Sequence, residues 1–109
     1  MARIAALAPD LFFASKIDAT LTAAGHQVTI AGNAAALPDD ADLLIVDLDA
    51  PGGTAADPPS GAPRLGFYSH VDVETRQRAE QAGFDLVVPR SRMAREMPEL
   101  VAQLVGSAR

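Results

Sequence analysis

The sequence predicts a single α/β domain in which a parallel sheet is covered by helices on both faces. Its 109 residues match the usual size of one domain. Short apolar runs alternate with segments whose apolar residues recur at helical spacing, the order typical of a parallel sheet wound with helices. Residues 42–48 (DLLIVDL) are apolar on both faces at the centre of the run, as expected of a middle strand buried on both sides.

The first strand and helix follow from a short apolar run and a capping residue. Residues 3–8 (RIAALA) predict a strand, and Pro9 ends it. Asp10 is a suitable N-cap for a helix over residues 11–24, and Gly25 suits the position after it because glycine tolerates a positive φ. The apolar residues of this helix predict one buried face: Phe13, Ile17, Leu21 and Ala24.

The middle of the chain predicts another strand and two connections. Residues 26–31 (HQVTIA) alternate in polarity as a strand does, and residues 33–37 allow a short helix before Pro38. After the strand at 42–48, residues 50–63 are dominated by Gly, Pro, Ala and Asp. We expect this segment to be an exposed loop, so that a helix between the third and fourth strands is reduced or absent.

The last third of the chain predicts two strands, each followed by a helix. Residues 64–68 (RLGFY) and 84–88 (FDLVV) are the strands. Between them, Asp72 is a candidate N-cap for a helix over residues 73–82 that ends at Gly83 and carries a thin stripe of small residues: Val73, Ala79 and Ala82.

The C-terminal segment predicts a turn and then a helix. Ser91 can cap a turn over residues 92–97, and Pro98 suits the first position of a helix that runs to about residue 105. The residues expected to be buried are Leu100, Val101, Leu104 and Val105.

Composition argues against several classes of function. The formal net charge is −5, whereas a general nucleic-acid binder is usually basic, so we expect no nucleic-acid partner. No apolar run approaches the ~20 residues of a membrane span, and the N-terminus lacks a secretory signal, so we expect no membrane association. The absence of cysteine fits a reducing cytoplasm, where we expect the protein to act.

The polar residues of interest follow the predicted strand ends. In parallel α/β sheets the loops at the carboxyl ends of the strands carry the site. Here those loops supply one candidate pocket, made of Asp10, Asp47, Asp49, Tyr68, Ser69, His70 and Arg90.

Three motifs in this order resemble those of the response-regulator receiver domain. Residues 42–47, followed by Pro-Gly at 51–52, resemble that family's third strand, which ends in the phosphoacceptor aspartate. Residues 82–85 (AGFD) before an apolar strand, and Pro63 at the opening of the fourth strand, are the other matches. The resemblance covers nearly the whole chain. It implies a flavodoxin-like three-layer α/β/α sandwich, with a five-stranded parallel sheet in the order 2-1-3-4-5.

The sequence departs from the receiver pattern at the positions that carry its chemistry. The resemblance puts Asp47 at the phosphoacceptor position, but Ala8 and Pro9 stand where the family has two acidic residues that help to hold Mg²⁺. Asp10 lies one step beyond, and one displaced carboxylate with Asp47 is a poor cage for an ion that needs near-octahedral oxygen ligands. We therefore expect no metal site and no cofactor.

Two further positions differ from the receiver pattern. The count from Pro63 puts Tyr68 at the family's Ser or Thr position, with Ser69 as the alternative if the register slips by one. Arg90 corresponds to the family's lysine and keeps its charge but not its geometry. Because a partly buried carboxylate without Mg²⁺ needs another positive charge, we expect Arg90 to pair directly with Asp47.

Other patterns at this edge do not predict catalysis. Asp47 and Asp49 point the same way along a strand, but two carboxylates without a third ligand are usually polar strand-end residues. Ser69 beside His70 lacks the Gly-x-Ser-x-Gly pattern of a nucleophile elbow. We expect no catalytic residues and no enzyme.

We interpret the sequence as a stand-alone pseudo-receiver, a bacterial-type signalling domain that acts through contact with another protein or with itself as a homodimer, without Mg²⁺-dependent phosphorylation. Two alternatives stay open. One is a phosphorylatable receiver with an altered site that uses Asp10, Asp47 and Ser69. The other is a small-molecule or nucleotide-binding module with its ligand in the strand-end crevice. Few aromatic residues (5%) are present to stack on a flavin.

Overall fold

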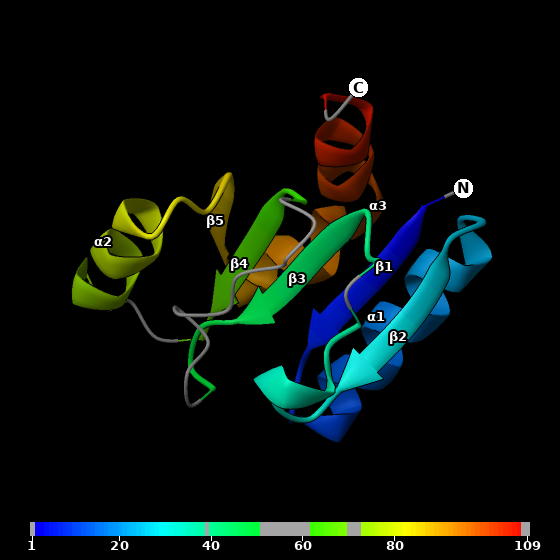
Figure 1. Ribbon diagram of the computed structural model, residues 1–109, viewed down its shortest axis with the longest axis horizontal. Coiled ribbons are helices and arrows are strands. Elements are labelled where there is room, and N and C mark those ends of the chain that lie inside the picture. The colour runs from blue at the N-terminus through cyan, green and yellow to red at the C-terminus, as the bar shows by residue number, and fades with distance from the viewer. Residues whose placement is uncertain (1, 39, 51–61, 70–72, 108–109) are drawn as a thin grey trace.

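The protein is described by a computed structural model over residues 2–38, 40–50, 62–69 and 73–107. These residues form one five-stranded parallel sheet in the order β2-β1-β3-β4-β5 (Figure 1), which confirms the predicted fold class and strand order. The strands are β1 (Arg3–Leu7), β2 (Gln27–Ala31), β3 (Leu43–Asp47), β4 (Arg64–Tyr68) and β5 (Leu86–Pro89). All strand ends lie within two residues of their predicted positions.

Three α-helices and one 3-10 turn are found in the described ranges: α1 (Leu11–Ala23), η1 (Ala34–Ala36), α2 (Val73–Gln81) and α3 (Arg90–Ser107). The short helix predicted over residues 33–37 is this 3-10 turn. The C-terminal segment is helical from Arg90, directly after β5 and without the cap predicted at Ser91. Its two helical stretches, labelled together as α3, are joined by a kink, which agrees with the predicted break before Pro98. Its kink at Glu96 (φ −119°, ψ 17°) precedes Pro98, which has no N–H to continue the helical hydrogen bonds.

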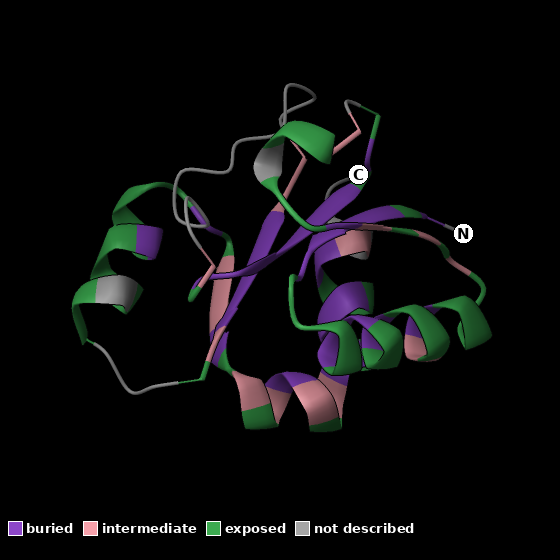
Figure 2. Ribbon diagram, turned by 90° about the horizontal axis from the view of Figure 1, so that it is seen from below, coloured by how far each residue is buried: buried purple, intermediate pink, exposed green. Residues whose placement is uncertain are grey.

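The helices α1 and α3 lie side by side on one face of the sheet and cover most of the large apolar side chains (Figure 2). The buried face predicted for α1 is confirmed for Phe13, Ile17 and Leu21, whereas Ala24 is the C-cap and is exposed. In α3, the predicted Leu100, Val101 and Leu104 are buried and Val105 is half-buried. The first part of that helix also buries two residues that the sequence analysis did not identify, Met93 and Met97.

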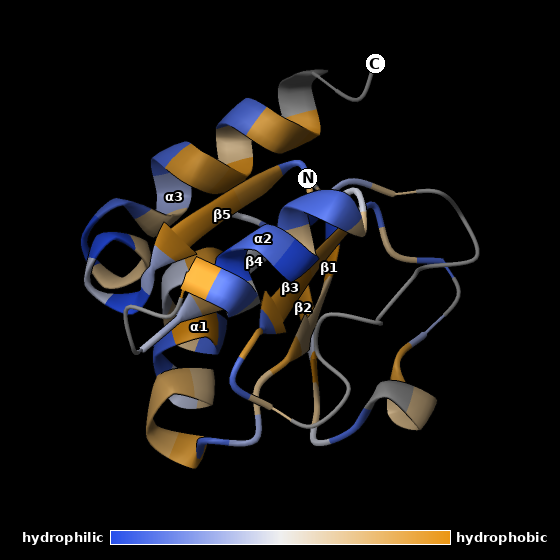
Figure 3. Cartoon of the chain, turned by 90° about the vertical axis from the view of Figure 1, so that its left-hand side faces the viewer, coloured by the Kyte–Doolittle hydropathy of each residue, from blue (hydrophilic) through white to orange (hydrophobic). Residues whose placement is uncertain are grey.

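The opposite face has a different covering. There α2 lies beside β5 (Figure 1), and its ribbon is hydrophilic over most of its length (Figure 3). Among the described side chains of the predicted stripe, Ala79 is buried, but Val73 is 62% exposed and Ala82 is exposed, so the stripe is wrong at two positions. The anchor is Arg64 at the start of β4, because its guanidinium donates to the carbonyl of Ala82 and lies 4.6 Å from the centre of the Phe84 ring.

Residues 51–61 lie outside the described residues, so the exposed loop and the reduced third helix predicted for residues 50–63 stay predictions. No helix in the described ranges is both long and apolar enough to cross a membrane.

Candidate functional site

The carboxyl ends of the strands meet at one edge of the sheet, as the sequence predicts. Asp47 of β3 is the register partner of Phe67 in β4, and Tyr68 is the partner of Pro89 in β5. Ser69 and Arg90 therefore leave the sheet at the same edge as Asp47. Asp10 reaches this edge from the loop after β1.

Asp10 caps α1, and both of its carboxylate oxygens have partners. Its Oδ1 accepts hydrogen bonds from the backbone N–H groups of Phe12 (3.0 Å) and Phe13 (3.4 Å), which confirms the predicted N-cap. Its Oδ2 accepts from Nη2 of Arg90 at 2.6 Å. The hydrogen bond from Arg90, followed by that from the Phe13 N–H, lowers the pKa of Asp10 below its ordinary value.

Arg90 joins the start of α3 to the start of α1. Its guanidinium carbon lies 4.4 Å from the centre of the Phe13 ring, which is a cation–π distance, while Nη2 pairs with Asp10. The side chain is only 28% exposed, so the ring and the carboxylate hold it in one place. Phe13 in turn packs against Phe67 at 4.8 Å between ring centres, which ties this arrangement to the sheet.

The predicted ion pair between Arg90 and Asp47 is wrong. Within the described part of the chain, the carboxylate paired with Arg90 is that of Asp10. The physical reason is the helix arrangement. Because α1 and α3 pack on the same face of the sheet, the first residue of α3 meets the cap of α1 before it reaches the end of β3. Arg90 acts on Asp47 only through its longer-range charge.

Asp47 is a buried carboxylate, 8% exposed, at the end of the middle strand. Its Oδ1 accepts a hydrogen bond from the backbone N–H of Asp49 at 3.0 Å. Burial raises the pKa of Asp47, and the negative charge of Asp49 adds to this, while the Asp49 N–H and the charge of Arg90 oppose it. Asp47 therefore holds a proton more readily than an ordinary aspartate.

Asp49 and Ser69 form a second contact at this edge. Oδ2 of Asp49 accepts from both the backbone N–H and the hydroxyl of Ser69, each at 2.7 Å. The hydroxyl hydrogen of Ser69 is thus directed to Asp49. Tyr68 is half-buried against the second face of the sheet, beside α2. His70 lies outside the described residues.

The predicted pocket residues therefore divide into separate groups. Asp10 pairs with Arg90, Asp49 pairs with Ser69, and Asp47 bonds to the backbone of Asp49. Sequence reasoning missed Phe13 as the surface on which the guanidinium rests. The available signal was its position three residues after the cap, on the buried face of the first helical turn.

Solved structures of other proteins share this architecture, whereas sequence comparisons find no match. No profile of a known family matches the sequence, and no curated protein matches it. The strand order and the acidic carboxyl edge define a doubly wound parallel α/β domain. Within that class, the fold is that of CheY-like response-regulator receiver domains, because solved structures of such domains superpose on it.

Three of these structures illustrate the likeness. A CheY-like receiver domain protein from Methanospirillum hungatei has a TM-score of 0.85 and 17% identity, over 99% of this chain and 96% of that one. NtrX from Brucella abortus, in complex with ADP, has a TM-score of 0.81 and 16% identity, over 98% of this chain but only 26% of NtrX. A response regulator from Burkholderia pseudomallei with a phosphorylated aspartic acid, calcium ion and citrate has a TM-score of 0.77 and 19% identity, over 99% of this chain and 69% of that one. At these identities the likeness establishes the fold and not the activity.

Proposed function

We propose that this domain is a pseudo-receiver, a response-regulator-like signalling domain that works through protein contacts and is not controlled by Mg²⁺-dependent phosphorylation. The ion pair between Asp10 and Arg90 carries this proposal. The carboxylate of Asp10, the nearest to the end of β1 in the sequence, both caps α1 and pairs with the guanidinium of Arg90. This ion pair therefore lies at the edge of the sheet where a receiver would place its metal ligands.

The donor set of this edge does not fit Mg²⁺. That ion needs several oxygen ligands in near-octahedral geometry. Ala8 is buried in the core and offers no side-chain oxygen, and both oxygens of Asp10 already accept hydrogen bonds. In the described ranges, no group of three or more His, Asp or Glu side chains is found that could hold a metal ion.

The charge of Asp47 supports the same proposal. Phosphoryl transfer depends on positive charge that neutralises the transferring group, and in receivers the metal supplies it. Here the guanidinium of Arg90 is turned to Asp10, and burial raises the pKa of Asp47. The cation that corresponds to the family's lysine is therefore not directed at the carboxylate that would accept a phosphoryl group.

Two exposed apolar residues support a function in protein contact. Leu11 (79% exposed) and Phe12 (92% exposed) form the first turn of α1, directly after Asp10. Large apolar side chains of this kind are enriched in protein interfaces. In this proposal the ion pair keeps α1 and α3 in one arrangement, and a partner protein reads that fixed surface.

The test is labelling with acetyl phosphate and Mg²⁺, followed by intact-mass and peptide mass spectrometry. We expect no acyl phosphate on the wild-type chain, because Asp10 is committed to the α1 cap and to Arg90, and Ala8 offers no ligand. The Asp47→Asn variant is the control for any nonspecific adduct. A Mg²⁺-dependent adduct that appears on the wild type and is lost in Asp47→Asn would support the alternative of a phosphorylatable receiver instead.

That alternative rests on one observation. Asp47 lies at the end of β3, the position that the resemblance assigns to the phosphoacceptor, with its carboxylate oriented by the N–H of Asp49. The similar structure from Burkholderia pseudomallei contains a phosphorylated aspartic acid. The double variant Pro9→Asp with Arg90→Lys separates the two proposals. If the missing metal ligand and the misdirected cation are the cause, this variant should accept label while the wild type does not.

A further inference from the structure

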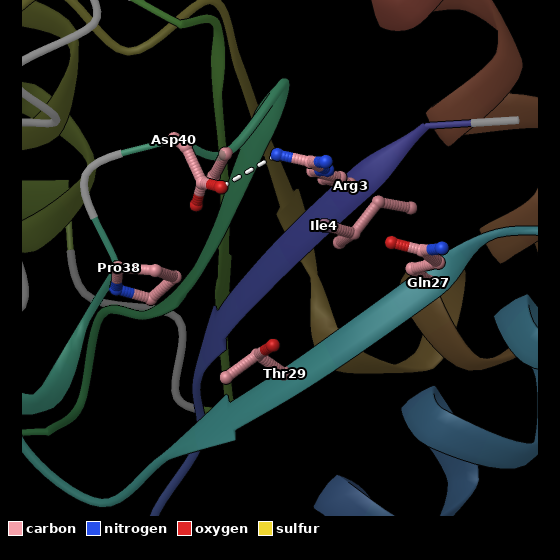
Figure 4. A pocket seen from close by; sticks show the side chains of 7 residues that line it. Arg3, Ile4, Gln27, Thr29, Pro38 and Asp40 are labelled. Carbon is pink, nitrogen blue, oxygen red and sulfur yellow. Dashed lines mark hydrogen bonds and ion pairs between the residues drawn. The ribbon is translucent and has the colours of Figure 1, made fainter.

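A hollow of about 250 Å³ lies near the amino ends of β1 and β2, at the opposite end of the sheet from the candidate site. Figure 4 shows the side chains that line it. Its lining residues come from β1, β2 and the segment before β3: Arg3, Ile4, Gln27, Thr29, Pro38, Asp40 and Ala41. Arg3 and Gln27 are register partners, so their side chains stand on the same face. This is the face away from α1 and α3. It is open here because the connection from β2 to β3 contains only the short turn η1 in its described part.

Among the described lining residues, the charged side chains are one opposite pair, Arg3 and Asp40. Nη1 of Arg3 lies 2.6 Å from Oδ2 of Asp40, and Figure 4 shows the two side chains directed toward each other. Both side chains are largely exposed, 62% and 64%, so this ion pair contributes little to stability and can be replaced at small cost. The main chain of Arg3 is held separately, because its N–H donates to Asp42 at 2.8 Å.

This combination of charges selects among ligands. A simple anion would be attracted by Arg3 but repelled by Asp40, whereas a simple cation would be attracted by Asp40 but repelled by Arg3. A purely apolar molecule would leave the amide of Gln27 and the hydroxyl of Thr29 without partners. None of the described lining residues is aromatic, so these residues offer a nucleobase no ring to stack on. The volume is below the ~300–1,000 Å³ typical of pockets for drug-sized ligands.

We propose that this hollow binds a small zwitterion of the α-amino-acid type. The ligand carboxylate takes the place of Asp40 on the guanidinium of Arg3, whose planar fork suits two parallel hydrogen bonds. The ligand ammonium group pairs with Asp40. Gln27 and Thr29 supply neutral donors and acceptors on the β2 side, and Pro38 contacts a short side chain. Binding of this ligand would let a small molecule regulate the domain from a site separate from the carboxyl edge of the sheet.

The test is an NMR titration of the ¹⁵N-labelled chain with L-alanine and with L-glutamine, at fixed pH and ionic strength. Concentrations up to about 50 mM reveal millimolar affinity. We expect saturable shifts of the backbone amides of Ile4, Thr29 and Ala41. Acetate and ethylammonium, which each carry half of the zwitterion, should bind at least about tenfold more weakly, since each leaves one charged partner unsatisfied.

Two variants locate the binding, and a matched pair controls for charge removal. Arg3→Gln and Asp40→Asn should each weaken binding about tenfold or more. The control is Arg76→Gln with Glu80→Gln, which removes an equally exposed ion pair (2.9 Å; 60% and 54% exposed) from α2 and should leave the affinity unchanged. The proposal is overturned if neither amino acid gives saturable shifts, if acetate alone reproduces them, or if Arg3→Gln binds as tightly as the wild type.

Discussion

Two arginine–aspartate pairs with the same 2.6 Å separation stand at opposite ends of this sheet, yet they differ in nearly everything else. At the carboxyl edge, Arg90 is 28% exposed, lies over the ring of Phe13 and pairs with the cap of a helix. At the amino end, Arg3 is 62% exposed and pairs with Asp40 across a hollow. Distance alone therefore does not tell which pair holds the fold and which one can exchange partners; the surroundings of the guanidinium decide.

The largest expected effect comes from removing the ring that supports Arg90. Phe13 is 8% exposed and packs against Phe67, so Phe13→Ala should lower the free energy of unfolding by about 3–5 kcal/mol. Phe13→Leu keeps most of the apolar volume but removes the aromatic face, and should cost about 0.5–1.5 kcal/mol. Urea denaturation measures both. No measurable loss for Phe13→Leu would mean that the cation–π contact contributes nothing beyond packing.

The direct comparison replaces each arginine in turn. Arg90→Ala should cost about 1–2 kcal/mol, because it removes the contact with Phe13 and the packing of the arginine stem. Arg3→Ala should change the free energy of unfolding by less than about 0.5 kcal/mol, as is usual for an exposed pair. Thermal and urea unfolding of the two variants under the same conditions measure the difference. Equal costs would contradict the distinction drawn between the two ends of the sheet.

An effect smaller than that of Arg90→Ala concerns Asp47 and depends on pH. Because its folded-state pKa is raised, the folded chain binds more protons than the unfolded chain between the ordinary value of 3.8 and the folded value. This contribution makes the free energy of unfolding fall as pH rises through that window. Asp47→Asn keeps the acceptor for the Asp49 N–H and removes the buried charge, so it should stabilise the protein at pH 7 by up to about 1 kcal/mol.

Asp10 provides an internal contrast to that measurement. Its folded-state pKa is lowered, so its contribution to stability is present above 3.8 and is lost as pH falls below that value through the folded pKa. The pH profile of Asp10→Asn should therefore lose a stabilising contribution, while that of Asp47→Asn loses a destabilising one. If the two substitutions change the pH dependence of the free energy of unfolding in the same direction, Asp10 and Asp47 do not have the opposite environments described above.

The sequence by itself determined the parallel sheet wound with helices and the cap of α1, because both depend on local patterns, whereas the strand order followed from the resemblance to receiver domains. Alternating strands and helices leave few topologies for a parallel sheet, and Asp10 caps the helix through backbone N–H groups two and three residues away. The buried face of α1 followed from helical spacing in the same way. The thin stripe of α2 did not follow, because Ala79 is buried but Val73 and Ala82 are exposed.

Only the tertiary structure decided which charges meet. Arg90 and Asp10 are 80 residues apart, and their pairing depends on two helices that start side by side on one face of the sheet. The sequence placed Asp10, Asp47 and Arg90 on one edge of the sheet. It could not show which of the two carboxylates lies closer to the guanidinium of Arg90. The hollow beside Arg3 was likewise invisible, because it exists where a connection is too short to cover two strands. Periodicity assigns each side chain to a face of its own element, whereas the packing of whole elements assigns its partners.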